Sequence, residues 1–329
     1  LVAMKDVNGN NKFDPKTDKI GFQKDILSFP NDTLYEIELF KEVVPFKAVN
    51  AVQASANRLT LGYEGDAKEV KIELKKGTEK IPFKVSKLAN KDSLNIWFKA
   101  QKNDSLAIDV VKGAYKKSFV MKVKEQKKDS IIFTNERGSD LHFRDRFSLY
   151  SNTVIDRIDV SKIKFIDKDS TDVAFKTQYD EYNQKVYFDF EKKPVEKYKL
   201  TLFPGALIDF NEKQNDTLVY DFSTKSETDY GNLRVKLENV KRFPVILELT
   251  TQDGKIIASA TSDKATEINF DLVEPQLFTL RLIDDDNKNQ VWDTGSFLEK
   301  RQAEEVIYFP KQIDVRANWD VEQPFDVGK

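Results

Sequence analysis

Residues 233–238 read LRVKLE, and the pattern of this stretch decides the fold class. Apolar and charged residues alternate, so an extended strand would have one apolar face and one charged face. The same alternation recurs at 70–75 (VKIELK) and 186–190 (VYFDF). Such strands pack one face on a core and expose the other to water, as antiparallel sheets do. Apolar residues at helical spacing are scarce, and the best helical candidate is the short segment 297–304. The chain is therefore predicted to be all-β.

Composition limits the number of domains and the kinds of partner. A chain of 329 residues with 40% hydrophobic residues can form about three β domains of roughly 100 residues each. The net charge of -2 argues against nucleic acid as a partner, because nucleic-acid-binding proteins need a basic face to displace counterions. The absence of Cys excludes disulfides, thiol catalysis and zinc–cysteine sites. No apolar run approaches the roughly 18 residues of a membrane helix.

A short acidic–Ser/Thr–aliphatic triplet recurs along the chain. Asp and Ser/Thr side chains bind nearby backbone N–H groups and favour turns, and the aliphatic residue favours a following strand. Each triplet therefore predicts the start of a strand, and no base accompanies the hydroxyls to make them nucleophiles. The triplets lie at 32–34, 92–94, 104–106, 129–131 and 216–218.

Breaks in the alternation predict four segments. Residues 1–45 are too short to close a sandwich, and we expect them to be the C-terminal part of a truncated β-sandwich domain. Residues 46–136, 137–226 and 227–329 each have the size of an immunoglobulin-like module. The links between them lack the Pro or Gly content of long flexible tethers. We therefore expect tandem immunoglobulin-like or transthyretin-like β-sandwich modules arranged as a rod.

The first and last segments share an internal repeat. Residues 1–6 (LVAMKD) align with 280–285 (LRLIDD), and both lead into a loop of the form Asp-x-Asn-x-Asn-x-x-aromatic-Asp. Further on, Ser28-Phe29-Pro30 aligns with Tyr308-Phe309-Pro310, and strands are expected after both, at 34–40 and 313–319. The chain is thus expected to begin inside a copy of its own last module.

The repeated loops resemble calcium ligand sets. Calcium takes six to eight oxygens, often from loop positions 1, 3, 5, 7 and 9. Side-chain oxygens would fill four of these positions in each loop and a backbone carbonyl would fill position 7. The predicted ligands are Asp6, Asn8, Asn10, the Lys12 carbonyl and Asp14 in the first loop, and Asp285, Asn287, Asn289, the Val291 carbonyl and Asp293 in the second.

Two features of an EF-hand loop are missing. Position 6 is Asn11 or Gln290 instead of Gly, and position 12 is Thr17 or Ser296 instead of a bidentate Glu. The alternative is that the Asp and Asn side chains cap the amides of their own turn. The sequence leaves both interpretations open, with calcium as the only cofactor considered.

Nothing in the sequence favours catalysis. His142 is the only histidine, and no nucleophile elbow accompanies it. The carboxylates fall mostly on the polar phase of strands or in turns such as Asp167, Asp169 and Asp172, which suit a solvated face better than a cleft. No catalytic residue is therefore predicted.

Two tryptophans could serve as sugar-stacking platforms. Trp97 and Trp319 both lie in or beside predicted strands. This context favours core or interdomain positions for both rings.

Two regions resemble a known bacterial family. Residues 198–224 (YKLTLFPGALIDFNEKQNDTLVYDFST) resemble the end of a Big_5 or SbsA-like Ig-like domain, and 159–165 fit its early strand. The matching features are Tyr198, the Pro204-Gly205 turn, Asp209 and the closing Phe222-Ser223-Thr224. Residues 280–295 and 313–325 resemble the C-terminal part of the Ig-like-domain lipoproteins of Bacteroidota.

The resemblance implies an outer-membrane protein held by a lipidated Cys that lies outside this chain. It implies a non-catalytic scaffold or binding protein whose partners are other outer-membrane or surface proteins, for example as an accessory subunit of a complex. Sheet edges and module junctions would be its contact surfaces. A carbohydrate-binding surface module is the alternative function.

Overall fold

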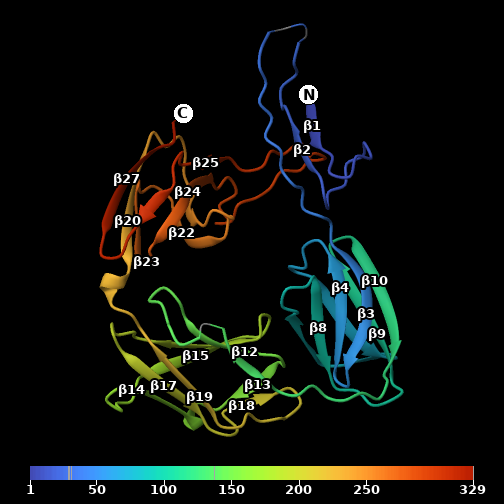
Figure 1. The fold of residues 1–329 in the computed structure, drawn as a ribbon. Helices are drawn as coiled ribbons and strands as arrows, with labels where there is room; N and C mark the ends of the chain where they lie inside the picture. The colour runs from blue at the N-terminus through green and yellow to red at the C-terminus, as the bar shows by residue number, and fades with distance from the viewer. Residues whose placement is uncertain (29, 31, 137, 329) are drawn as a thin grey trace. The chain divides into compact units, whose positions relative to one another are not determined.

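The computed structural model describes residues 1–328 except 29, 31 and 137. Strands and turns make up nearly all of this part of the chain (Figure 1). Its two helical segments are three-residue 3₁₀ turns, η1 (Val160–Lys162) and η2 (Glu227–Asp229). The predicted all-β class with tandem β-sandwich modules is confirmed. The chain forms two compact units, one of residues 1–44 and 226–329 and the other of residues 45–225.

The unit of residues 45–225 begins with a sandwich of two four-stranded sheets, of order β3-β4-β8-β7 and β10-β9-β5-β6. Leu59, Ile96 and Ile108 lie in the core between them. The strands are β3 (Lys47–Ser55), β4 (Arg58–Glu64), β5 (Lys71–Lys76), β6 (Glu79–Lys80), β7 (Phe83–Lys87), β8 (Ser93–Phe98), β9 (Ser105–Lys112) and β10 (Tyr115–Lys122).

A second sandwich follows in the same unit. It has sheets of order β11-β12-β16-β15 and β14-β17-β19, with the pair β13-β18 beside them. Its core is aromatic, and the Phe147 and Phe222 rings stack with centroids 4.2 Å apart. The strands are β11 (Phe133–Asn135), β12 (Phe147–Ser151), β13 (Ile155–Ile158), β14 (Ile163–Asp167), β15 (Phe175–Asp180), β16 (Lys185–Phe190), β17 (Lys197–Leu202), β18 (Leu207–Asp209) and β19 (Leu218–Ser223).

The other unit contains the third sandwich. One sheet has the order β23-β20-β27, with β20 and β27 parallel, and the other has the order β22-β21-β24-β25, with β26 also paired to β24. The strands are β20 (Gly231–Glu238), β21 (Val245–Thr250), β22 (Ile256–Ser262), β23 (Glu267–Val273), β24 (Gln276–Asp284), β25 (Val306–Tyr308), β26 (Ile313–Val315) and β27 (Asp320–Asp326).

The first segment of the chain forms only a strand pair, β1 (Val2–Lys5) with β2 (Lys19–Phe22). Val2 aligns with Arg281 in the internal repeat. Val2 pairs with Phe22 and Arg281 pairs with Tyr308, so β2 is the counterpart of β25 in the last module. The counterpart of Tyr308 is therefore Phe22, and the predicted alignment of 28–30 with 308–310 is wrong. Phe29 itself lies outside the described residues.

The predicted strand at 34–40 is also wrong. Only Phe40 forms a β-bridge, to Ile20, and Leu34 is 85% exposed. The alternating sequence has no neighbouring strand to pair with, and a strand is stabilised by its cross-strand pairs.

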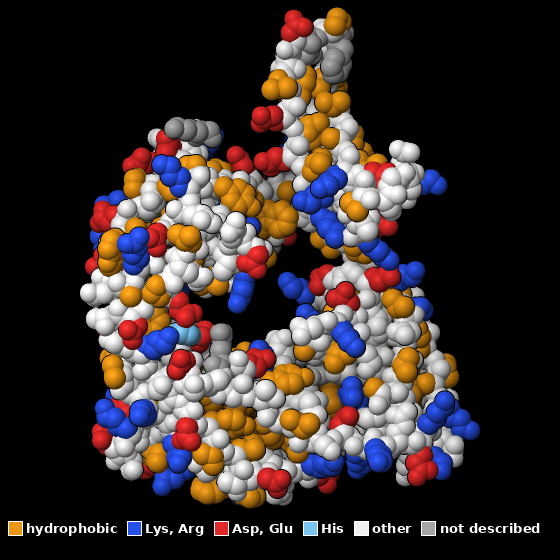
Figure 2. Space-filling view, viewed as in Figure 1, with side chains coloured by type: hydrophobic (Ala, Val, Ile, Leu, Met, Phe, Trp, Pro, Cys, Tyr) orange, Lys and Arg blue, Asp and Glu red, His pale blue; other side chains and the backbone are white. Residues whose placement is uncertain are grey.

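The alternating stretches behave as predicted. Leu233, Val235 and Leu237 are buried while the charged residues between them are exposed. Strands begin within the triplets at 92–94, 104–106 and 216–218, whereas the triplets at 32–34 and 129–131 begin none. Figure 2 shows the result, with charged side chains of both signs across the visible face.

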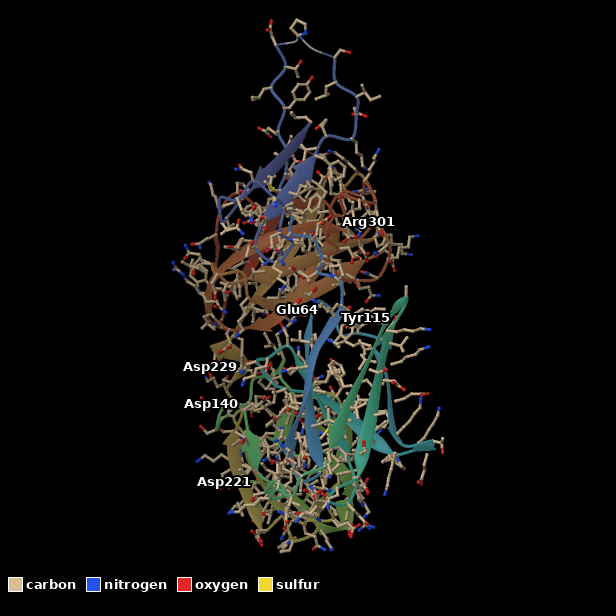
Figure 3. All side chains as sticks on the ribbon, turned by 90° about the vertical axis from the view of Figure 1, so that its right-hand side faces the viewer. Glu64, Tyr115, Asp140, Asp221, Asp229 and Arg301 are labelled. Carbon is tan, nitrogen blue, oxygen red and sulfur yellow. The ribbon has the colours of Figure 1, made fainter. Side chains whose placement is uncertain are left out.

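The predicted helix at 297–304 is a turn instead. Ser296 and Arg301 form a β-bridge across it, and Arg301 (Figure 3) donates an Nη1–H bond to the Thr294 carbonyl at 2.5 Å. A helix this short is marginal without tertiary support. Here the tertiary contacts favour the turn, because the Phe297 ring packs edge-on against Phe22 at 5.7 Å.

Candidate functional site

The first Asx loop is a turn capped by its own side chains. The Asp6 carboxylate accepts hydrogen bonds from the backbone N–H groups of Gly9 at 2.7 Å and Asn11 at 2.6 Å. Asn10 Oδ1 accepts one from the Lys12 N–H at 2.7 Å. Asn8 is exposed at the tip. This geometry is that of an Asx turn.

The second Asx loop repeats the arrangement. Asp285, which is 3% exposed, accepts hydrogen bonds from the backbone N–H groups of Asn289 at 3.0 Å and Gln290 at 2.9 Å. Asn289 Oδ1 accepts from the Val291 N–H at 2.8 Å. The Nδ2 groups of Asn287 and Asn289 both donate to Asp293 Oδ2 at 2.6 Å. The second loop is therefore more tightly cross-linked than the first.

Each loop is closed by a buried carboxylate that the sequence analysis did not pair. Asp18 is fully buried and accepts from the backbone N–H groups of Val7 at 3.0 Å and Asp14 at 2.8 Å. Glu304 is 5% exposed and accepts from the backbone N–H groups of Asp286 and Asp293 at 2.8 Å each. These two residues are the counterparts of Val7 and Asp14 in the second loop. The two acids stand at different sequence distances from their loops, so no alignment reveals their common role.

The two closing carboxylates have opposite pKa shifts. The hydrogen bond from the Asp14 N–H holds the pKa of Asp18 below its usual range. Burial raises the pKa of Glu304, although its two backbone hydrogen bonds oppose the shift.

The carboxylate at the first predicted calcium position of each loop is engaged within the protein. Both oxygens of Asp6 and both of Asp285 accept backbone hydrogen bonds. Arg242 pairs with two further acids beside the second loop, Asp284 and Asp286, at 2.8 Å each. Within the described part of the chain, no group of three or more acidic or His side chains is arranged to hold a metal ion. Calcium binding at these loops stays a prediction.

The first segment packs on the chain just after the second loop. The ring of Phe40 lies against Gly295, where an added Cβ would come within 2.5 Å of it. Gln302 Nε2 donates to the Phe22 carbonyl at 2.6 Å. Phe22 and Phe40 meet edge to face at 6.1 Å. Residues 20–22 and 40–42 thus form one interface with residues 294–303, which we call the clasp.

Polar side chains are buried at the junction of the two sandwiches in residues 45–225. Trp97 and Asn95 lie on the face of β8 opposite the core residues, yet they are 0% and 2% exposed. Trp97 donates its Nε1–H to Ser86 Oγ at 2.9 Å, and the Arg58 guanidinium lies over the Trp97 ring at 5.3 Å. A sheet face that would be wet in an isolated sandwich is therefore covered.

Residues 137–225 make contacts beside this face. Lys84 on β7 lies 3.3 Å from the Asp156 carboxylate and 3.1 Å from the Glu181 carboxylate. The Lys87 N–H donates to the Tyr182 carbonyl at 2.7 Å. Lys84 is paired with Trp97 and shares its outward sheet face, so the second sandwich reaches this face at the edge strand β7.

Asp129 locks the connection between the two sandwiches. Its carboxylate accepts from Arg58 Nε at 2.9 Å and Ser55 Oγ at 2.7 Å, and its carbonyl accepts from Lys213 Nζ at 2.9 Å. Burial would raise the pKa of Asp129, but the bonds from Arg58 and Ser55 outweigh it and hold that pKa below its usual range. The connecting segment is therefore bonded to the sandwiches on both sides.

The other residues considered from the sequence take structural or exposed positions. His142 is half-buried. Asp167 Oδ1 accepts from the N–H groups of Asp169 at 3.1 Å and Thr171 at 2.9 Å, so this cluster is a capped turn. The core position predicted for Trp97 is confirmed in that its ring is buried. The same prediction for Trp319 is wrong, because this ring is 54% exposed beneath the Arg316 guanidinium.

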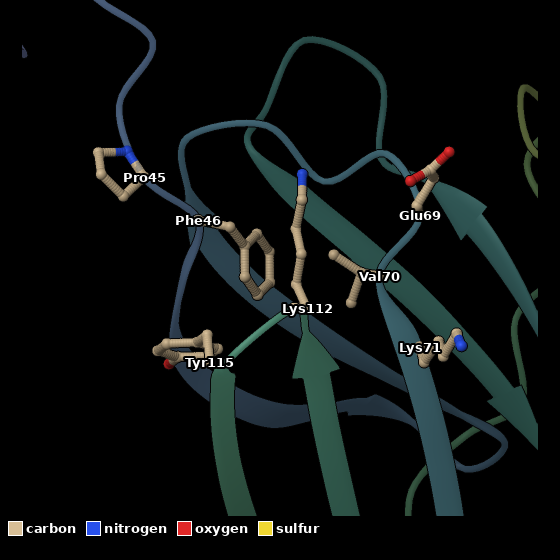
Figure 4. A pocket seen from close by; sticks show the side chains of 8 residues that line it. Pro45, Phe46, Glu69, Val70, Lys71, Lys112 and Tyr115 are labelled. Carbon is tan, nitrogen blue, oxygen red and sulfur yellow. The ribbon is translucent and has the colours of Figure 1, made fainter. Parts of the chain in front are cut away.

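A shallow pocket at one end of the first sandwich is shown in Figure 4. Phe46, Val70 and Tyr115 line it, but Phe46 is only 8% exposed. Lys112 Nζ donates to the Asp66 carbonyl at 2.6 Å, and the Tyr115 hydroxyl bonds to Ala48. The aromatic rings serve the fold and present no open platform for a sugar.

Comparisons with known proteins add little to this picture. No protein-family model matches the sequence, and no curated protein matches it. An I-band fragment of titin is 12% identical over 85% of this chain and 98% of that chain, with a TM-score of 0.19. A variant of BcpA, the major pilin subunit of Bacillus cereus, is 11% identical over 78% and 94%, with a TM-score of 0.21.

The Bacillus anthracis TIE protein is 11% identical over 62% of this chain, with a TM-score of 0.20. The chain spans 41% of the length of that protein. Among the described residues, no helix has the length and apolar content needed to cross a membrane.

Proposed function

We propose that the chain is a non-catalytic scaffold or binding protein of the bacterial cell envelope. Its sequence resemblance suggests an outer-membrane location in a Bacteroidota-like bacterium, with a lipid anchor outside this chain and other outer-membrane or surface proteins as partners. The observation that carries the scaffold role is the buried junction around Trp97. A junction of this kind holds two modules at a fixed angle and presents their surfaces together.

Chemical cross-linking in isolated envelopes, followed by mass spectrometry, tests this proposal. Wild-type chain is expected to cross-link reproducibly to one or a few envelope proteins. A Trp97→Ala variant of the same chain, in which the junction is loosened, is expected to lose part of this set. Identical cross-links from both proteins would contradict a role for the fixed junction.

The alternative function is binding of carbohydrate at the surface. Exposed aromatic rings favour it, since Trp319 is 54%, Tyr308 56% and Trp292 39% exposed. Such rings can stack on sugars. Selective binding on a glycan array that is lost in Trp319→Ala would support this alternative over the scaffold role. An array without selective binding would exclude it.

A further inference from the structure

The chain-wide net charge conceals two oppositely charged modules. Residues 46–136 contain 19 Lys and Arg against 11 Asp and Glu, which gives a net charge of +8. Residues 227–329 contain 13 Lys and Arg against 20 Asp and Glu, which gives -7. A difference of this kind between parts of one chain points to electrostatic binding.

Part of the basic charge of the first sandwich lies on one outer sheet face. On β10 and β5 the apolar residues point into the core, which leaves the alternate residues pointing outward. Lys116 and Lys71 are both opposite Val111 of the central strand, so the three residues form one row across the sheet. The outward face of β10, β9, β5 and β6, which we call the basic face, carries Lys71, Lys75, Lys80, Lys116, Lys122, Glu73 and Asp109.

The acids on the basic face are already neutralised. Lys75 lies 2.8 Å from the Glu73 carboxylate and 2.9 Å from the Asp109 carboxylate, and Lys80 lies 2.8 Å from Glu73. Three exposed lysines have no ion-pair partner among the described residues, and these are Lys71, Lys116 and Lys122. The face therefore offers three positive charges to a partner.

The last module has a sheet face of opposite charge. Leu233, Val235 and Leu237 of β20 point into the core, so the residues between them point outward together with alternate residues of β23 and β27. Arg234 and Lys236 lie in the middle of this outward surface, which we call the acidic face. Its acids are Glu238, Glu267, Asp271, Asp320, Glu322 and Asp326. With six acids and two bases, the acidic face has a net charge of -4.

We propose that the basic face of one copy of this chain docks on the acidic face of a second copy. Both faces are outer surfaces of sheets, and their net charges of +3 and -4 are complementary. Such a contact is heterologous, since it joins two different surfaces, and it leaves one unused face on each partner for further copies. This inference goes beyond the proposed function, because it names a partner and the surface that binds it.

The size of the faces sets the expected strength. The strands of each face lie about 4.8 Å apart, and at roughly 3.3 Å per residue their summed lengths give each face an area on the order of 400 Å². This is below the roughly 800 Å² per partner of a standard stable interface. The association is therefore expected to be weak, concentration-dependent and sensitive to salt, because exposed charges are screened within a Debye length of about 10 Å at 0.1 M salt.

Sedimentation velocity of the full chain tests the proposal. At about 20 mM salt, the weight-average sedimentation coefficient is expected to rise with protein concentration, and at about 500 mM salt it is expected to stay at the monomer value. Two triple variants remove the charges. One is Lys71→Glu, Lys116→Glu and Lys122→Glu, and the other is Glu238→Lys, Asp271→Lys and Asp320→Lys. Each alone is expected to stay monomeric, and mixing the two is expected to restore association.

A matched control separates the faces from charge in general. The variant Lys164→Glu, Lys176→Glu and Lys197→Glu makes the same charge change at exposed sites of the middle sandwich, and it is expected to associate like wild type. Circular dichroism and melting curves verify that every variant is folded. The proposal is overturned if wild type shows no concentration dependence at low salt or if the control loses association too. It is also overturned if wild type stays monomeric while binding an added polyanion such as polyphosphate.

Discussion

Truncation of Trp97 gives the sharpest test of the buried junction. A buried Trp covers roughly 150–250 Å², and at about 25 cal/mol/Å² its loss corresponds to about 4–6 kcal/mol before relaxation. Measured Trp→Ala changes in cores fall near 3–5 kcal/mol. Trp97 is 0% exposed and lies outside the core of its own sandwich, so much of this loss falls on the contact between the two sandwiches.

Differential scanning calorimetry of the full chain measures the effect. In wild type, residues 45–225 are expected to unfold in one cooperative transition, whereas Trp97→Ala is expected to split it into two and lower the first midpoint. Trp319→Ala is the matched control, because the same truncation at a 54% exposed ring is expected to change stability by less than about 0.5 kcal/mol. The reasoning is refuted if the two variants melt alike, or if Trp97→Ala lowers one transition without splitting it.

Three further predictions concern the clasp and the loops. Gly295→Ala places a Cβ about 2.5 Å from the Phe40 ring, so it should destabilise the clasp by about 1–3 kcal/mol and speed hydrogen exchange at 20–22; unchanged exchange would contradict the contact. In a carboxyl NMR titration, Asp18 should titrate below 3.8 and Glu304 above 4.5. The contribution of Asp18 to the free energy of unfolding is thus present above pH 3.8 and is lost as pH falls through its folded pKa. The contribution of Glu304 is present below pH 4.5 and is lost as pH rises through its folded pKa. For calcium, a loop that binds it should release or absorb heat and raise the melting temperature at about millimolar calcium, and a calorimetric trace without heat at that concentration would end the calcium interpretation.

Local patterns predicted the strands well because strand alternation is a local property. The strand at 233–238 could be predicted from its own alternation of apolar and charged residues. The strand starts at 92–94 and 104–106 could be predicted from the turn-forming Asp and Ser residues there. The segment 34–40 alternates just as clearly and forms no strand, because pairing depends on a neighbour that the sequence does not specify. The same reason explains why 297–304 became a turn once Phe297 met Phe22.

The parts of the site that the sequence did not reveal depend on contacts between distant residues. Asp18 and Glu304 bind equivalent amides from unrelated sequence positions, so only the fold shows that they are equivalent. The burial of Trp97 against its neighbours in space, and the exposure of Trp319, likewise depend on which sheet face another module covers. Net charge summed over the whole chain hid the +8 and -7 modules, because opposite charges cancel in a total.

The distance between the two sandwiches of residues 45–225 tests the central claim, a fixed junction, most directly. The chain has no Cys, so Val120→Cys and Val219→Cys introduce two unique labelling sites on exposed positions of β10 and β19. Electron–electron double resonance between spin labels at these sites is predicted to give one narrow distance distribution in the full chain. Adding Trp97→Ala should broaden it. A broad distribution without that substitution would contradict a fixed junction and the scaffold role that rests on it.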